Sequence, residues 1–171
     1  MPRMLRSTVI ASGMAALLNG CAGETAPPVP APAATSATFA FATDAEVRAQ
    51  IAAMLSEMKP DQGFMWRPLV EGGAQVAAIE IWKKPGRPAT HPVETEYAIV
   101  LEGSGTLIAG GVMVAPVTLP SGIIEGDRID GGTERPLAPG DVILIPAGVP
   151  HWFGVTGDRL VLLGTKMREQ Q

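Results

Sequence analysis

The stretch that most constrains the fold runs from Gly140 to Val155 and reads GDVILIPAGVPHWFGV. Residues 142–145 are apolar, mostly β-branched and bounded by turn residues, which indicates a short buried strand. The following Pro-Ala-Gly-Val-Pro segment predicts a tight turn, because proline lacks a ladder donor and glycine favours a bend. Apolar alternation resumes at His151, which predicts a second strand with an imidazole at its start.

The composition favours many short strands joined by turns. The chain has 171 residues with 20 glycines and 16 prolines, enough for one domain with a real core. We therefore expect an all-β sandwich or barrel. The formal net charge is −4 and no long basic cluster is present, so we expect no nucleic-acid partner.

The first 20 residues indicate a signal peptide. Arg3 and Arg6 precede an apolar run at residues 8–18 that is too short to span a bilayer. The run ends in Leu-Asn-Gly-Cys, which resembles a bacterial lipoprotein signal, and the resemblance implies that Cys21 becomes the lipid-modified N-terminus. The alternative is a plain secretory signal with an incidental cysteine.

Three segments follow from this division of the chain. Residues 1–20 are expected to be removed, residues 21–42 to form a Pro/Ala-rich tether behind the lipidated cysteine, and residues 43–171 to form the folded domain. The lone cysteine allows no internal disulfide. The mature surface is mildly acidic, so membrane attachment would come from the lipid anchor only. The predicted location is the periplasmic side of the bacterial cell envelope, lipid-anchored or secreted.

One amphipathic helix is predicted from about Asp44 to Met58. Thr43 and Glu46 form a capping-box pattern at its start. Apolar residues recur at helical spacing and form one stripe: Val47, Ile51, Met54, Leu55 and Met58. We expect this stripe to pack on the outside of a sheet, with a dimerisation helix as the alternative.

The rest of the domain is predicted as antiparallel strands. Expected strands lie at residues 63–70, 75–82, 94–101, 106–114, 142–145, 151–155 and 159–166. Pro68 predicts an edge position for the first of these. Residues 83–92 are expected to form a loop, and residues 102–105 a turn that makes a hairpin of the strands on either side. Residues 115–132 are expected to form a longer loop with short strands near Ile123 and Arg128.

Two motifs resemble those of the cupin superfamily. In the second motif, Gly140, Pro146, Gly148 and His151 stand at the family's spacing, whereas Val155 replaces the usual closing asparagine. In the first motif, at residues 86–103, Glu96 and Gly103 match the family's carboxylate and turn glycine. Only one histidine of the usual His-x-His pair is present there, His91, and Ala89 occupies the position of the other.

The resemblance implies a cupin-type double-stranded β-helix, a jelly-roll barrel, with a metal held by His91, Glu96 and His151. Glu94 lies on the same strand face as Glu96 and is the rival or fourth ligand. A carboxylate inside an apolar barrel is costly without a partner, and imidazole and carboxylate together suit first-row metals. The expected cofactor is one divalent transition metal, Fe, Mn, Zn or Ni. A purely structural role for both histidines is the alternative.

By the same resemblance, the protein would act on a small polar molecule by oxygenase-type or isomerase-type chemistry. A non-catalytic module that captures a small ligand or a metal at the cell envelope is the alternative, and the missing histidine and Val155 favour it. A homodimer is expected by family analogy.

Overall fold

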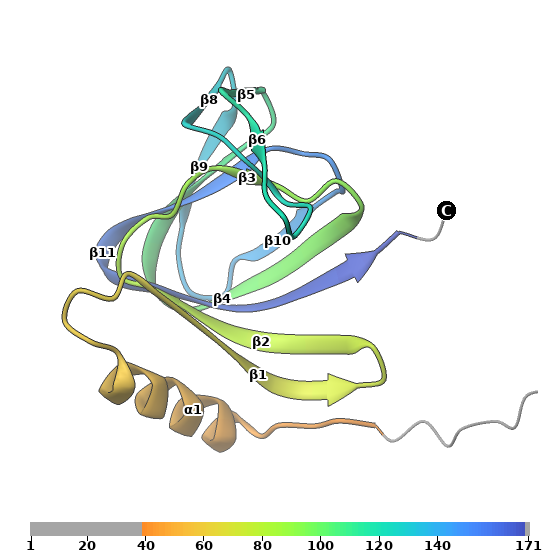
Figure 1. The fold of residues 1–171 in the computed structure, drawn as a ribbon. Coiled ribbons are helices and arrows are strands. Elements are labelled where there is room, and N and C mark those ends of the chain that lie inside the picture. Colours follow the sequence, from red (N-terminus) through yellow and green to blue (C-terminus); the bar gives the residue numbers. More distant parts are fainter. Residues whose placement is uncertain (1–38, 170–171) are drawn as a thin grey trace, which may run out of the picture. The chain divides into compact units, whose positions relative to one another are not determined.

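One helix lies against one face of a bent antiparallel sheet in the computed structural model, which describes residues 39–169 (Figure 1). The helix, α1, spans Asp44–Glu57. The strands are β1 Phe64–Gly72, β2 Gln75–Trp82, β3 Ala89–Thr90, β4 Glu94–Ala109, β5 Val112–Val114, β6 Val117–Thr118, β7 Ile124–Glu125, β8 Arg128–Asp130, β9 Thr133–Leu137, β10 Val142–Ile145 and β11 His151–Arg168.

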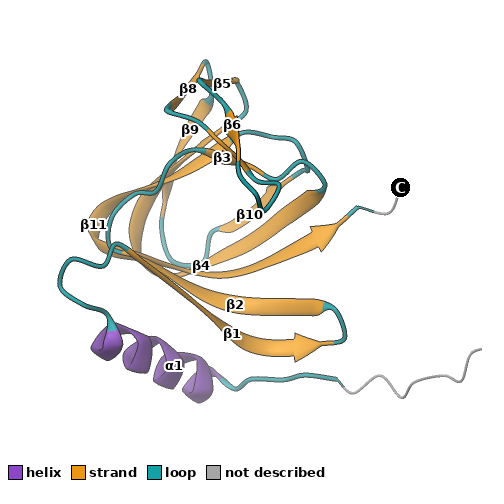
Figure 2. Ribbon diagram, viewed as in Figure 1, coloured by secondary structure: helices purple, strands orange, loops and turns teal. Residues whose placement is uncertain are grey.

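The fold is built on the two longest strands, β4 and β11, which pair antiparallel over nearly their whole length. β11 also pairs with β2, and β2 pairs with the edge strand β1. β4 also pairs with β10 at one end and with β9 at the other. Figure 2 shows these strands curving around a common interior, with loops and short strands gathered at one end. All the pairs are antiparallel, so the predicted all-β class is confirmed.

The predicted hairpin at residues 94–114 is wrong. Residues 102–105 do not turn back, because β4 continues through them to Ala109 and pairs with β11 on both sides. Gly103 has φ +81° and bends the strand, while the register of β11 shifts between Val155 and Leu160. The glycine that predicted a turn therefore marks a bulge in a continuous strand pair.

Close backbone approach explains why glycine occupies this bend. A Cβ at Gly103 would lie 2.0 Å from the Arg159 carbonyl oxygen, and one at Gly105 would lie 2.3 Å from the Gly154 carbonyl oxygen. No side chain fits at such distances, so both glycines allow β4 and β11 to stay paired where they bend.

The predicted helix is confirmed to within a residue. Thr43 and Glu46 form the capping box: the Thr43 side chain accepts from the Glu46 N–H, and the Glu46 carboxylate accepts from the Thr43 N–H. Its apolar stripe packs on the sheet, as expected for the outside position. The helix and the sheet together bury a first core cluster, which comprises Ile51, Met54, Met58, Ile79, Ile81 and Val161. Because its own sheet covers the stripe, the alternative of a dimerisation helix loses its basis.

A second core cluster fills the interior between the curved strands. Its buried members come from β4, β9, β10 and β11 and are Ala98, Val100, Leu137, Ile143, Ile145, Phe153, Leu160 and Leu162. Alternate residues of β4 and β11 face this cluster, which agrees with the period of two that the sequence shows.

Of the remaining predictions, some are confirmed and others are not. β1 lies at the sheet edge, as predicted, and its register shifts after Pro68, which the sequence did not indicate. The expected loop at residues 83–92 contains β3, which the sequence did not indicate, because a two-residue strand carries no periodic pattern. Residues 115–132 form the long connection expected, with β7 and β8 close to the predicted places and β6 in addition.

The predicted signal peptide, Cys21 and the tether as far as residue 38 lie outside the described residues. Within residues 39–169, no helix has the length and apolar character needed to cross a bilayer.

We predict that Gly103→Ala destabilises the fold by about 3 kcal/mol, because the added methyl group meets backbone and the positive φ disfavours alanine. Gly110→Ala is the matched control: its φ is +78°, yet no atom lies within 4 Å of the added Cβ. Strain alone should cost it about 1–2 kcal/mol. Chemical denaturation measures both variants, and equal losses would show that the close approach at Gly103 has no energetic weight.

Candidate metal centre

Three side chains that are distant in sequence meet in the interior. His91 directly follows β3, Glu96 lies near the start of β4, and His151 begins β11. The Pro-x-Gly turn holds two of them in register, because the Gly148 N–H donates to the His91 carbonyl oxygen at 2.8 Å. In the same turn, Gly148 is separated from His151 by Val149 and Pro150. The two motifs are thus tied by a backbone hydrogen bond.

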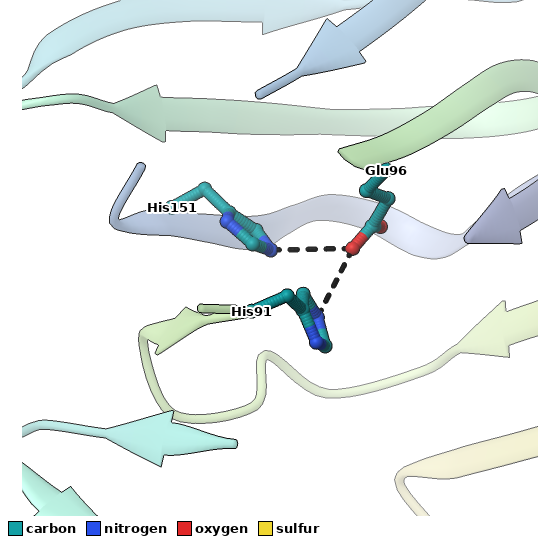
Figure 3. A group of neighbouring side chains, drawn as sticks. All are labelled: His91, Glu96 and His151. Atoms are coloured by element: carbon teal, nitrogen blue, oxygen red, sulfur yellow. Dashed lines mark ion pairs between the residues drawn. The ribbon is translucent and has the colours of Figure 1, made fainter. Parts of the chain in front are cut away.

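The three side chains point toward one another (Figure 3), and all three are buried. His91 Nε2 lies 3.2 Å from Glu96 Oε2, and His151 Nε2 lies 3.4 Å from the same oxygen. One potential ligand atom from each residue lies within 4.8 Å of the others. His91 is 7% exposed, and Glu96 and His151 are each 4% exposed. The structure therefore brings together the three residues that the sequence singled out.

Hydrogen bonding orients one imidazole toward the group. His151 Nδ1 lies 3.0 Å from the Val149 carbonyl oxygen, so this nitrogen carries the proton and donates. The other ring nitrogen, Nε2, faces the Glu96 carboxylate. If His151 is an imidazolium, Nε2 donates a proton to the carboxylate; if His151 is neutral, Nε2 offers a lone pair and a cation can lie between the two groups. A backbone carbonyl on Nδ1 is also the usual way in which proteins orient a metal-binding histidine.

The electrostatics favour an ionised Glu96. Burial by itself raises the pKa of this carboxyl group. Hydrogen bonds from His151 and His91 outweigh burial, with a further contribution from the Lys166 ammonium, and the pKa is held well below its usual range. A permanent carboxylate in a buried site needs positive charge beside it.

The donor set fits a divalent transition metal. Ligand atoms about 2.1 Å from a shared ion lie about 3.0 Å apart at a right angle and about 3.4 Å apart at the tetrahedral angle. The two observed imidazole–carboxylate distances, 3.2 and 3.4 Å, fall in this interval. Two neutral imidazoles and one carboxylate are donors that iron, manganese, zinc and nickel all accept, so geometry supports a metal without selecting one.

Glu94, the predicted rival or fourth ligand, is not brought into this group. Its Oε2 lies 4.0 Å from His91 Nδ1, on the nitrogen that does not face Glu96. His91 Nδ1 is buried and has no hydrogen-bond partner in the part of the chain that the structure describes. A small movement of Glu94 would satisfy it, which makes this carboxylate a candidate to orient His91 rather than to bind the ion.

The three residues line a cavity of about 580 Å³. Its other lining residues include two charged side chains that sequence reasoning missed, Glu80 on β2 and Lys166 on β11. Lys166 Nζ lies 3.5 Å from Glu96 Oε2 and 3.9 Å from Glu80 Oε1. The available signal was a charged residue at an inward position of an otherwise apolar strand: Glu80 stands between Ile79 and Ile81.

Residues 86–167 match the family model described as Cupin. The matched segment contains both motifs and all three converging residues. The match is a similarity to the cupin family over just under half of the chain, and the all-β fold built on β4 and β11 is of the predicted cupin type. No curated protein sequence matches this chain significantly.

Solved structures with similar folds include TT1209 from Thermus thermophilus, with 16% identity, a TM-score of 0.49 and coverage of 70% of this chain and 95% of that chain. KdgF from Halomonas sp. has 16% identity, a TM-score of 0.45 and coverage of 66% and 87%. An oxalate oxidase has 18% identity, a TM-score of 0.46 and coverage of 64% of this chain but only 53% of its own. At these values the structures carry no argument about chemistry.

We predict that removing the charge of Glu96 and of Glu94, both on β4, has different effects on metal binding. Glu96→Gln should abolish measurable binding of a divalent ion, because the amide removes the charged ligand. Glu94→Gln should weaken binding by only about 10-fold, the scale of losing a residue that orients a ligand. Competition against a chromophoric chelator measures both. Equal loss in the two variants would make Glu94 a ligand and contradict the placement described above.

Proposed function

We propose that this protein binds one divalent transition metal through His91, Glu96 and His151 and acts on a small polar molecule held in the adjoining cavity. The observation that supports the proposal most directly is the convergence of the three side chains on one buried point. The reaction classes that suit such a site are oxygenase-type and isomerase-type chemistry. The fold hosts many activities, so it does not choose between them.

Bound at this point, a metal would supply Lewis acidity or an oxygen-activating centre. The protein's own residues prepare the site. His151 is held by the Val149 carbonyl group, and Glu96 stays ionised because of its charged neighbours. Three protein ligands leave room for a further donor from water or substrate. The three side chains are buried beside apolar interior strands, and the low local dielectric constant strengthens each electrostatic contact.

A non-catalytic module that captures a small ligand or metal is the second candidate. The observation that favours it is Ala89, which lines the cavity where the cupin pattern would place another imidazole. Oxygen uptake and product formation across a panel of small polar metabolites, with the metal restored, would separate the two. Thermal stabilisation by a metabolite without any product would favour the binding module.

We predict that the purified protein carries one divalent ion per chain and that His151→Ala loses most of it, because one of three ligands is removed. Elemental analysis gives the metal content of both proteins. Glu134→Ala, on the exposed surface of β9, serves as the matched control and should keep the ion. Equal metal content in the wild type and His151→Ala would count against the proposed centre.

We also propose that the domain is tethered to a bacterial membrane on the periplasmic side by a lipid on Cys21. The support is the sequence of the first 21 residues, a basic start, an apolar run and a cysteine. The homodimer expected by family analogy stays a prediction.

For the anchor, we predict that Cys21→Ser moves the protein from the membrane fraction to the soluble fraction of the cell envelope, because the thiol that would carry the lipid is gone. Fractionation with metabolic fatty-acid labelling measures this. Cys21 is the single cysteine of the chain, so Ser36→Ala in the tether provides the control for handling. An unlabelled wild type would indicate a plain secretory signal instead.

A further inference from the structure

A second pair of charged side chains lies beside the candidate metal centre. Glu80 is 5% exposed and accepts a hydrogen bond from Trp82 Nε1 at 3.2 Å. Lys166 Nζ lies 3.9 Å from Glu80 Oε1, and the Lys166 side chain is 34% exposed. An ammonium group on a side chain that is one-third exposed can meet a ligand, whereas the Glu80 carboxylate is buried.

The sheet register points both side chains inward. Lys166 is the cross-strand partner of Glu96 in the β4–β11 pair, so the two share a face. Glu80 lies opposite Leu162, an interior core residue, in the β2–β11 pair. Gly164 leaves room for the Glu80 carboxylate: a Cβ at Gly164 would lie 3.2 Å from Glu80 Oε1.

This pair stands between two cavities. Glu80 and Lys166 line the cavity of about 580 Å³ that contains the metal-binding group. Together with Trp66 they also line a smaller cavity of about 140 Å³ over β2 and β11. A ligand in the larger cavity can therefore contact the candidate metal and the neighbouring Lys166 ammonium together.

The charge balance of the larger cavity decides what kind of ligand fits. Its lining holds three carboxylates, those of Glu80, Glu96 and Glu125, and two cations, Arg87 and Lys166. Arg87 pairs with Glu125 at 3.8 Å and with Asp127 at 2.7 Å, an exposed carboxylate that does not line this cavity. With both imidazoles neutral, as metal binding requires, the lining carries one excess negative charge. A divalent ion reverses this to one excess positive charge.

Protonation of Glu80 would raise the net charge of the lining by one, from one negative charge to zero without the ion and from one positive charge to two with it. Burial raises the pKa of Glu80, although Lys166 opposes the shift. A neutral Glu80 would leave the loaded cavity more positive still. Of the two cations that line this cavity among the described residues, Arg87 would keep its carboxylate partners, whereas Lys166 would be left with Glu96.

We propose that Lys166 anchors the ligand of this cavity and that the ligand is a small monocarboxylate. This inference rests on the metal-dependent function proposed above. The loaded cavity is positive whether Glu80 is ionised or neutral. A carboxylate, with one negative charge, leaves no negative excess in either state, whereas a phosphate monoester, with closer to two, would leave one when Glu80 is ionised. Glu80 keeps the Lys166 ammonium between the two cavities. The carboxylate of the ligand would accept a charge-assisted hydrogen bond from that ammonium in place of water.

Lys166 has an opposite effect on the two ligands that the cavity would hold. An ammonium 3.5 Å from the Glu96 carboxylate competes with a divalent ion for that group. Its removal should leave metal affinity unchanged or raise it several-fold, while it removes the contact to the anion. A lysine that served only to support Glu96 would behave differently, because its loss would weaken metal binding.

The test uses the purified protein loaded with Zn²⁺, which has no redox chemistry, and two probes of equal shape, L-lactate and uncharged L-lactamide. Isothermal titration should show binding of lactate and no comparable binding of lactamide. Lys166→Met should weaken lactate binding by about 10-fold or more, the scale of a charge-assisted hydrogen bond, without loss of Zn²⁺ affinity. Lys166→Arg should retain much of the lactate affinity. Lys59→Met, at an exposed position, is the control.

The outcomes separate this inference from the metal centre itself. Zn²⁺ binding with unchanged lactate affinity in Lys166→Met would overturn the inference and leave the metal centre standing, as would equal binding of lactamide. Absence of Zn²⁺ binding in the wild type would overturn both. If Lys166→Met fails to fold, as judged by circular dichroism, Lys166→Gln provides the same loss of charge with a polar side chain.

Discussion

The structure depends on the burial of one ionised carboxylate. Glu96 is 4% exposed on a strand whose next inward residues, Ala98 and Val100, are 1% exposed. An unpartnered carboxylate in such surroundings would cost several kcal/mol. Two imidazoles and one ammonium within 3.5 Å of the same Glu96 oxygen offset that cost. Because His151 Nδ1 donates to the Val149 carbonyl group, a neutral His151 turns an Nε2 lone pair toward this oxygen. Two acceptors that face each other are the physical reason to expect a cation at this point.

The pairing of β4 with β11 makes this concentration of charge possible. One strand supplies Glu96, and the other supplies both His151 and Lys166, from opposite ends. The 18-residue β11 can present both residues to one interior only if it bends midway, and the register shift after Val155 provides that bend. Gly103 and Gly105 allow β4 to follow. The glycine of the first motif thus acts on the site through the sheet, at a distance from the ligands themselves.

Sequence reasoning found the residues whose positions are fixed locally and missed those fixed by long-range pairing. His151 follows a Pro-x-Gly turn and Glu96 starts an alternating strand, so short-range patterns located both. Glu80 and Lys166 meet through the β2–β11 and β4–β11 registers, which link residues 80 and 96 to the far end of the chain, and no short window contains that information. Residues 102–105 were predicted as a turn for a related reason. A glycine with positive φ has the same local signature in a turn and in a bulge, and only the partner strand distinguishes them.

The two departures from the cupin pattern do not have equal weight for the function. Val155 is half-buried, packs against the interior core cluster, and is not among the described residues that line the cavity. Its replacement of asparagine therefore changes packing and leaves the metal-binding group untouched. Ala89 does line the cavity and is the cross-strand partner of His151. A methyl group in place of an imidazole opens space beside the candidate ion, and an ion with three protein ligands and free space accepts a fourth donor from outside. Ala89, the departure that favours a passive binding module, therefore also provides the space that a small anion would need to reach a metal ion bound at this site.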